Sequence, residues 1–535
     1  MSTVKSEWVR SHLARGLCAS FIALLLCITL NSLYFERSYF ETDTVSYLFQ
    51  AKLFSHGRLA ADAPPEPGFS PSTNINIING KWYSKYPFGN ALALAPGVLI
   101  GAPWLIPALA TGATVFLLYQ LLLSVYGSQT ALIGTVLGVL SPATSVAGAT
   151  LLSEAVDRFF AALFVVLLVR ALQRRSMVAS AVAAFALGYM ANTRVLTALV
   201  FGLTGVLYAA WWLRREWRMF FLLAGSAATV LVVMTGLSVA WNNQLTGSPF
   251  RFTHNVMHPY DRMGFGPRGP EFDVDTSRAY RYTVGKGAQR LFMKTIPAVF
   301  YSAFGWGYYD PKLNEQLKSA DLPGRLALFV RVVPLLLPPI LMLIPIFYRS
   351  ANRYEMFFAG IVVLNFVSYF FFYWDGATFG YTPVHTRYYT ECILLGVIPL
   401  AARSLCLVWE WLQTQRRAVL FAAVLVAVLL TANTAYSFTR FPEQFRSTGA
   451  FYWQLEHLVN KAAVHNAVIF VPSLHAPVGE YPFKSLEQAD VVYFRLGNSK
   501  SWGLSNTNWH VVFQRYFRGR QAYLFEKGKL LVLQE

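Results

Sequence analysis

The segment Leu17–Leu33, LCASFIALLLCITLNSL, is apolar almost throughout, and Glu41-Thr42-Asp43-Thr44-Val45-Ser46-Tyr47 follows it closely. A run of about 20 apolar residues is long enough to cross a bilayer. Asp43 is therefore a carboxylate placed where the chain leaves the membrane. These two stretches together predict a membrane protein with its chemistry at the membrane surface.

The composition extends this prediction to the whole chain. Of 535 residues, 55% are hydrophobic and 13% are charged, whereas soluble domains carry about 25% charged residues. The net charge of +18 lies mostly between apolar runs, which membrane topology explains, so we expect no nucleic acid partner. The four cysteines lie in or beside apolar runs without paired spacing, which predicts neither a disulfide framework nor a metal site.

Apolar runs bounded by charges predict a polytopic α-helical membrane protein with about eleven transmembrane helices. The first is expected to remain as an anchor, because no small-x-small cleavage site follows it. The stretch 177–213 is expected to form a tight hairpin of two short spans, and the run 291–309 is expected to lie at the membrane interface. The expected spans are 17–35, 104–124, 129–148, 151–170, 177–194, 196–213, 219–240, 325–347, 356–374, 390–411 and 417–436.

Basic clusters predict the orientation of these spans. With eleven spans they all fall on one side, which the positive-inside rule makes cytoplasmic. We therefore expect a multi-pass protein of the inner (plasma) membrane, with its C-terminus and active site facing the periplasm or exterior. The clusters lie near residues 5–15, 170–175, 214–218, 349–353 and 416–417.

The same topology divides the chain into a transmembrane domain, 1–436, and an external C-terminal domain, 437–535. The transmembrane domain has external loops at 36–103, 241–324 and 375–389. Short runs at 467–471, 491–494 and 510–513 are typical of strands, and 522–526 and 529–533 flank Lys527-Gly528, which suits a hairpin turn. The C-terminal domain is thus expected to be small and α/β or mainly β.

Polar groups gather in the external segments rather than in the middle of the spans, where a transporter would hold them. Asp43 begins a stretch with Tyr47, Ala51 and Phe54 at helical spacing. Asp43 either caps this helix or carries out chemistry. Lys85, beside Tyr86, either binds a phosphate or extends its ammonium to the membrane interface.

Two further external motifs carry charge. Glu154 and Asp157, at the start of the span 151–170, share one helical face. They either offset the helix dipole or join Asp43 around a cleft, where one pKa is raised or a divalent cation bridges them. In the other motif, His385-Thr386-Arg387-Tyr388, Arg387 either binds a phosphate or belongs to an aromatic belt.

Cations also occur in the loop 241–324, but their spacing is too loose for a metal motif, and we expect no zinc site there. These residues are Arg251, His254, His258 and Arg262.

The order of these motifs resembles the GT-C superfamily of polyprenyl-phosphate-sugar glycosyltransferases, in particular bacterial proteins related to protein O-mannosyltransferases and aminoarabinose transferases. Many relatives have Asp-Glu where this chain has Asp43-Thr44, and Tyr-Pro-Pro-Gly where it has Tyr86-Pro87-Phe88-Gly89. The motifs are the segment around Asp43, Lys85–Gly89, Leu152-Ser153-Glu154-Ala155, Asn192-Thr193-Arg194, 242–249 and Arg387-Tyr388-Tyr389.

The resemblance implies an inverting transfer of a sugar from a polyprenyl-phosphate donor to an acceptor hydroxyl at the outer face of the membrane. Asp43 would be the general base, and Arg387, Lys85 and Arg194 would hold the donor phosphate. The substrate-binding residues implied are Tyr86, Glu154, Asp157, His385 and Tyr388.

No cofactor is certain, although a divalent cation is possible on this interpretation. The acceptor is a lipid, a glycan or a protein. Two other functions stay open: a lipid-linked glycan ligase or polymerase that uses a pyrophosphate donor, and a non-catalytic lipid or glycan transporter.

Overall fold

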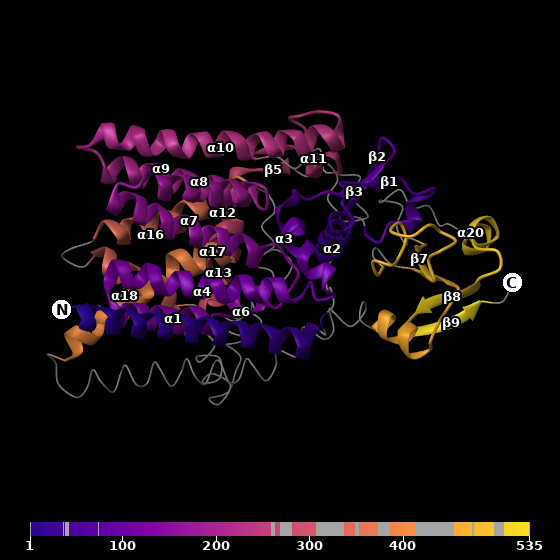
Figure 1. The fold of residues 1–535 in the computed structure, drawn as a ribbon, viewed down its shortest axis with the longest axis horizontal. Helices are drawn as coiled ribbons and strands as arrows, with labels where there is room; N and C mark the ends of the chain where they lie inside the picture. The colour runs from indigo at the N-terminus through magenta and orange to yellow at the C-terminus, as the bar shows by residue number, and fades with distance from the viewer. Residues whose placement is uncertain are drawn as a thin grey trace.

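The computed structural model consists of a bundle of long helices with a strand-rich region at one end (Figure 1). The first helix begins at the end of the bundle far from the strands, and the C-terminal strands lie at the opposite extreme of the molecule. The residues described are 2–35, 37, 42–72, 74–257, 263–267, 281–305, 336–347, 352–372, 386–413, 454–472, 476–496 and 508–533.

Within the described residues, five helices are long and apolar enough to cross a membrane, or six if the pair α5 and α6, bent by 57°, is one span. The expected span 417–436 lies outside the described residues, so the count of eleven stays a prediction. The bundle helices are α1 Ser2–Leu30, α4 Leu105–Tyr126, α5 Ser128–Leu140, α6 Pro142–Gly148, α7 Glu154–Arg174, α8 Met177–Ala191, α9 Val195–Trp212, α10 Trp217–Thr246, α16 Arg353–Phe370, α17 Thr390–Cys392 and α18 Ile398–Leu412.

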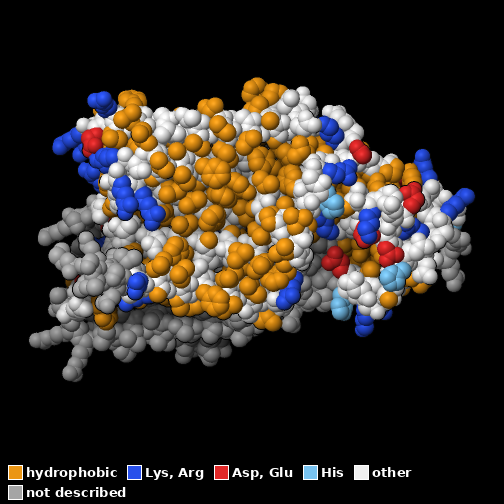
Figure 2. Space-filling model, viewed as in Figure 1, with side chains coloured by type: hydrophobic (Ala, Val, Ile, Leu, Met, Phe, Trp, Pro, Cys, Tyr) orange, Lys and Arg blue, Asp and Glu red, His pale blue; other side chains and the backbone are white. Residues whose placement is uncertain are grey.

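Helix α7 lies at the centre of the bundle, where it packs against α4 and α8. Its Val165 and Val169 belong to a buried apolar cluster that also contains Phe201 of α9 and Ile361 of α16. In contrast, α10 exposes apolar side chains such as Val232, which is 72% exposed. Figure 2 shows an apolar band between two ends that carry charged side chains, as expected for a bundle with lipid around it.

Three of the basic junctions meet at one end of the bundle. The guanidinium of Arg175, after α7, lies 2.6 Å from a carboxylate oxygen of Glu216, which precedes α10. Arg353, at the start of α16, lies over the ring of Trp212 at the end of α9, with 5.2 Å between guanidinium and ring centre. The prediction that these junctions share one side therefore agrees with the packing.

The described part of the run 291–309, which we expect at the membrane interface, is helical, and its position relative to a membrane stays a prediction. Residues 284–304 form α12 (Val284–Arg290), a π-helical turn (Leu291–Thr295) and α13 (Ile296–Phe304). Val299 and Phe300 are buried in the same cluster as α7. Other helices therefore cover these apolar side chains of α13.

The segment after α1, which we expect to be external, folds into α2 (Thr42–Ser55), three antiparallel strands and α3 (Phe88–Leu99). The strands are β1 (Ala61–Asp62), β3 (Lys81–Ser84) and β2 (Ile75–Ile78), in that order across the sheet. The helix predicted to begin near Asp43 is confirmed. The loop after α10 contains α11 Thr253–Met257, β4 Gly266–Pro267 and β5 Arg281–Tyr282.

Near the C-terminus four strands form a mixed sheet in the order β7-β6-β8-β9. β6 (Ala467–Val471) is parallel to β7 (Val491–Arg495) and to β8 (Gln521–Glu526). β8 and β9 (Lys529–Leu533) are antiparallel. The turn at Lys527 and Gly528, both with positive φ, confirms the predicted hairpin.

The strand predicted at 510–513 is wrong, because these residues lie in α20 (Trp509–Tyr516). The side chain of Asn508 accepts a hydrogen bond from the amide of His510 and caps this helix. Val512 and Phe513 are buried against the sheet. This packing overrides the strand preference of two adjacent valines.

A buried arginine ties α7 to its neighbours, and it provides a test of the fold. Arg158 is fully buried, and its guanidinium donates to the carbonyl oxygens of Ala143 and Thr144 and to the hydroxyl of Thr111. We expect Arg158→Met to lower the free energy of unfolding by about 2 to 4 kcal/mol, because buried acceptors lose their donors. Thermal unfolding in detergent measures this. Arg170→Met, at an exposed position of the same helix, should change little; equal effects of the two variants would contradict the packing.

Candidate active site

Charged side chains converge where several elements begin at the strand-rich end of the bundle. Asp43 lies in the first turn of α2 and Glu154 in the first turn of α7. Arg194 immediately precedes α9, and Arg387 lies in the short helical turn Arg387–Tyr389 before α17. Helix starts carry partial positive charge, so this end of the bundle favours anions.

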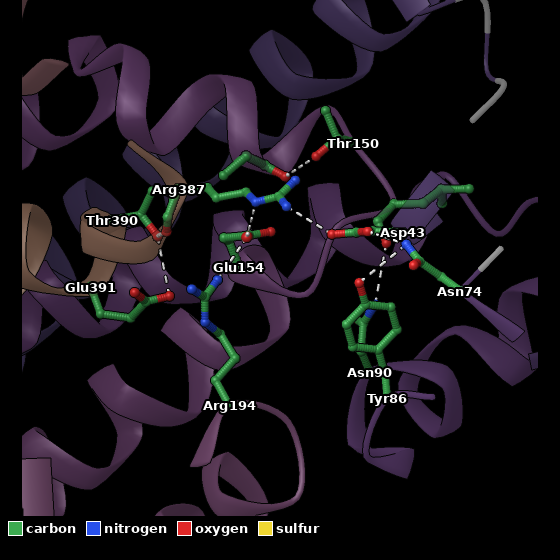
Figure 3. Close-up of polar contacts among 12 residues, drawn as sticks. Asp43, Asn74, Tyr86, Asn90, Thr150, Glu154, Arg194, Arg387, Thr390 and Glu391 are labelled. Carbon is green, nitrogen blue, oxygen red and sulfur yellow. Dashed lines mark hydrogen bonds and ion pairs between the residues drawn. The ribbon is translucent and has the colours of Figure 1, made fainter. Parts of the chain in front are cut away.

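These side chains form a row of alternating charge (Figure 3). A guanidinium nitrogen of Arg387 lies 2.7 Å from a carboxylate oxygen of Asp43, and its Nε lies 3.8 Å from Oε1 of Glu154. The same Glu154 oxygen lies 2.6 Å from the guanidinium of Arg194. Asp43, Arg387 and Arg194, which the sequence placed in separate motifs, thus lie in one row: Asp43 contacts Arg387, and Glu154 joins Arg387 to Arg194.

Both carboxylate oxygens of Asp43 have partners. The side-chain amide of Asn74 donates to Oδ1 at 2.6 Å, and Arg387 donates to Oδ2 at 2.7 Å. Burial raises the pKa of Asp43, but the nearby cations Arg387 and Lys85 and a hydrogen bond from Tyr86 outweigh it, so this pKa lies below its ordinary value of 3.8. Asp43 is therefore a carboxylate at neutral pH, with 15% of its side chain exposed.

Lys85 and Tyr86 lie next to Asp43, directly after β3. Lys85 is buried and lies close enough to Asp43 to lower its pKa, with its ammonium 5.0 Å from the ring centre of Tyr86. The Tyr86 ring also packs on Tyr47 of α2, 4.5 Å between centres. The predicted phosphate ligand Lys85 therefore belongs to the Asp43 cluster.

Tyr388 lies beside both arginines. The guanidinium of Arg194 lies 4.8 Å from its ring centre, and that of Arg387 lies 5.3 Å from it. Cations over an aromatic face are stabilised by the ring's negative face. Tyr388 thus helps to keep two guanidinium groups close together despite their like charge.

The turn between α8 and α9 is held against α3, which sets the position of Arg194. The amide of Gly89 donates to the carbonyl oxygen of Asn192 at 2.6 Å. A Cβ atom on Gly89 would lie 2.4 Å from the hydroxyl oxygen of Thr193, so only glycine permits this approach. The predicted motifs 85–89 and 192–194 therefore meet through their backbones.

Some predicted site residues do not join the row. Asp157 is fully buried one helical turn beyond Glu154, and within the described residues neither of its carboxylate oxygens has a hydrogen-bond partner. His385 lies outside the described residues, as do His258 and Arg262. His254, in α11, lies near Asp43 and Tyr86.

The sequence did not identify Asn74 or Glu391 as site residues. Asn74 lies in a loop, and its sequence context carries no signal for its contact with Asp43. Glu391 is fully buried and accepts a hydrogen bond from Thr390 at 3.1 Å, and it interacts electrostatically with Arg194. A carboxylate at the start of an expected span was the signal that could have identified it.

The carboxylates do not fit the divalent cation that the sequence left open. Asp43 and Glu154 face each other across the guanidinium of Arg387, which occupies the bridging position between them. Within the described residues there is no group of three or more His, Cys, Asp or Glu side chains suited to a metal ion.

The lowered pKa of Asp43 makes the stability of the fold depend on pH. A carboxyl group with a folded-state pKa below its ordinary value stabilises the fold above that ordinary value, and this contribution is lost as pH falls through the folded-state pKa. We expect Asp43→Asn to lower the melting temperature at pH 7, with the difference shrinking below about pH 4. Asp62→Asn, at a fully exposed carboxylate of the same loop, is the control. A difference that persists unchanged at low pH would contradict the ion pair.

Comparison with known proteins gives matches among solved structures only. No family model and no curated protein matches the chain. ArnT from Cupriavidus metallidurans in the apo state matches with a TM-score of 0.50 and 12% identity, over 97% of this chain and 93% of that chain. The Archaeoglobus fulgidus oligosaccharyltransferase in the apo form matches with a TM-score of 0.50 and 13% identity, over 96% and 69%.

A second structure of the archaeal enzyme also matches. This is AglB from Archaeoglobus fulgidus in complex with an inhibitory peptide and a dolichol-phosphate, with a TM-score of 0.50 and 11% identity over 82% of this chain and 56% of that chain. At such identities the likeness concerns the fold alone. The bundle and its strand-rich end thus share their fold with these solved structures, which agrees with the resemblance seen in the sequence.

Proposed function

We propose that the protein is a membrane glycosyltransferase that transfers a sugar from a polyprenyl-phosphate donor to an acceptor hydroxyl, with inversion, at the outer face of the inner (plasma) membrane. The observation that carries this proposal is the Asp43–Arg387–Glu154–Arg194 row, with Lys85 beside it. A carboxylate and several cations at one site suit a reaction in which a hydroxyl loses a proton and a phosphate leaves. The dolichol-phosphate in the AglB complex supports a lipid phosphate as the leaving group.

Arg387, Lys85 and Arg194 are the proposed ligands of the donor phosphate. The guanidinium of Arg387 is able to donate two parallel hydrogen bonds to a phosphate, but in the free protein one of its N–H groups donates to Asp43. The phosphate therefore competes with Asp43 for Arg387. Once the phosphate takes the guanidinium, Oδ2 of Asp43 is released to accept a proton.

The chemical step then follows from this exchange. Asp43 accepts the proton of the acceptor hydroxyl while the hydroxyl oxygen bonds to the anomeric carbon. The bond from that carbon to the phosphate oxygen breaks, and polyprenyl phosphate leaves with the electron pair. The sugar passes through an oxocarbenium-like state, and attack opposite the leaving group inverts the anomeric centre. The cations stabilise the charge that grows on the phosphate.

The remaining predicted residues are proposed to bind substrate. Tyr86 and Tyr388 offer aromatic side chains next to the base and the arginines, and Glu154 offers a carboxylate; Asp157, which is fully buried in this structure, is retained from the sequence. His385 is retained as a proposal from sequence. The acceptor is a lipid, a glycan or a protein, and the apolar bundle surface suits contact with membrane lipids and the donor's tail.

The direct test is transfer by the purified protein. We expect the wild type to transfer sugar from a radiolabelled polyprenyl-phosphate donor to an acceptor extract of the cell envelope, and Asp43→Asn to be about 100- to 10,000-fold slower, as for loss of a general base. Asp62→Asn should transfer normally. A polyprenyl-pyrophosphate sugar serves as the second donor. Transfer from this donor alone, or equal rates for Asp43→Asn and wild type, would overturn the proposal.

The proposed competition between Asp43 and the phosphate for Arg387 gives a second prediction, which concerns binding of the lipid phosphate rather than the rate of transfer. We expect Asp43→Asn to bind undecaprenyl phosphate more tightly than the wild type, because the variant no longer holds Arg387. Arg387→Met should bind it about tenfold or more weakly. Binding of radiolabelled lipid to purified protein at one salt concentration measures both. Weaker binding by Asp43→Asn, with its fold intact, would show that the phosphate does not compete with Asp43.

A further inference from the structure

The C-terminal sheet packs on the external segment that leads to Asn74. Phe69 is buried, and its ring lies 5.0 Å from that of Phe494 on β7 and 5.3 Å from that of Tyr481. The residue before it, Gly68, comes so close that a Cβ atom would lie 2.3 Å from the Phe494 ring. A substituent at this position would push the segment away from the sheet.

Two hydrogen bonds continue the contact along the backbone. The buried guanidinium of Arg495, at the end of β7, donates to the carbonyl oxygen of Ser70. The amide of Ala476 donates to the carbonyl oxygen of Pro71 at 2.8 Å. The C-terminal region therefore determines the backbone position of residues 70 and 71 from outside the external loop.

A line of hydrogen bonds runs from Ser70 to Asp43. The Ser70 hydroxyl donates to the carbonyl oxygen of Ser72 at 3.0 Å. The Ser72 hydroxyl donates to the carbonyl oxygen of Thr42 and accepts from the amide of Asn74, both at 3.1 Å. The Asn74 side chain then donates to Oδ1 of Asp43 at 2.6 Å. All of these links are buried or partly buried, where hydrogen bonds hold geometry well.

We propose that the C-terminal domain positions the general base: Arg495 acts through Ser70, Ser72 and Asn74 to hold the carboxylate of Asp43. This inference rests on the proposed function. Arg495 and Asn74 are positioning residues, because neither one is proposed to touch the donor or the reacting atoms.

The proposed donor step explains why such a support is needed. Asp43 loses its contact with Arg387 when the phosphate binds, so fewer hydrogen bonds hold its carboxylate at the moment of reaction. Asn74 then keeps Oδ1 in place while Oδ2 accepts the proton. A base displaced by about 1 Å costs on the order of 100-fold in rate. A domain that only shielded the site from solvent would not need this line of hydrogen bonds.

The variants that test the inference are Arg495→Met, which removes the donor to Ser70, and Asn74→Ala. For both, we expect kcat of sugar transfer to fall by about 10- to 100-fold, while KM for the polyprenyl-phosphate donor stays within about twofold because the phosphate ligands are intact. The acid limb of the pH profile of kcat should also move to higher pH, because Asp43 loses a donor to its charged form. Arg495→Lys, which keeps one donor for Ser70, should restore most of the rate.

The control is Arg518→Gln, an exposed arginine of the same domain that bonds to Gln514; it should match the wild type. Thermal unfolding identifies any variant that is misfolded, and Asn74→Ala leaves the Phe69–Phe494 contact untouched. Active variants with unchanged kcat and acid limb would overturn the positioning role alone. Absence of transfer by the wild type would overturn the proposed function and this inference with it.

Discussion

The ion pair between Arg387 and Asp43 joins residues 344 positions apart, and the architecture of the site depends on it. For the pair to form, the turn before α17 must meet the first turn of α2, and α2 lies in the segment between α1 and α3 at the strand-rich end rather than among the long bundle helices. Glu154 orients Arg387 from the other side. The pair is partly exposed, with 15% of each side chain accessible, so a ligand is able to reach both groups.

Much of this site could be predicted from short motifs, because charge in an apolar chain is conspicuous. Asp43, Lys85, Glu154, Arg194 and Arg387 each stand beside a long apolar run, and the structure brings all five together. The sequence pattern could not show which of these charged side chains contact one another, because that depends on how the helices pack in three dimensions. It also missed Asn74, because an uncharged residue in a polar loop has no feature that marks a contact with a carboxylate.

The error at 510–513 has the same origin. The valine pair at 511–512 favours a strand locally, yet a helix buries Val512 against Phe470 and Phe517 and leaves Val511 exposed. The run at 291–309 also depends on its neighbours, because Val299 and Phe300 of α13 pack among the bundle helices. Local preference is weak compared with burial, so the sequence pattern is least informative where a segment's neighbours are other parts of the protein.

The charges at the site match both ends of the proposed reaction. A sugar linked to a lipid phosphate is a phosphodiester with one negative charge. After transfer Asp43 holds the proton and has lost its negative charge, while the departing phosphate monoester carries about two negative charges above its second pKa, roughly 6. The site therefore becomes more positive by one charge as the phosphate becomes more negative by one. Proton transfer to Asp43 thus leaves the net charge of the partly buried site and its ligand unchanged, which avoids the cost of an uncompensated charge away from water.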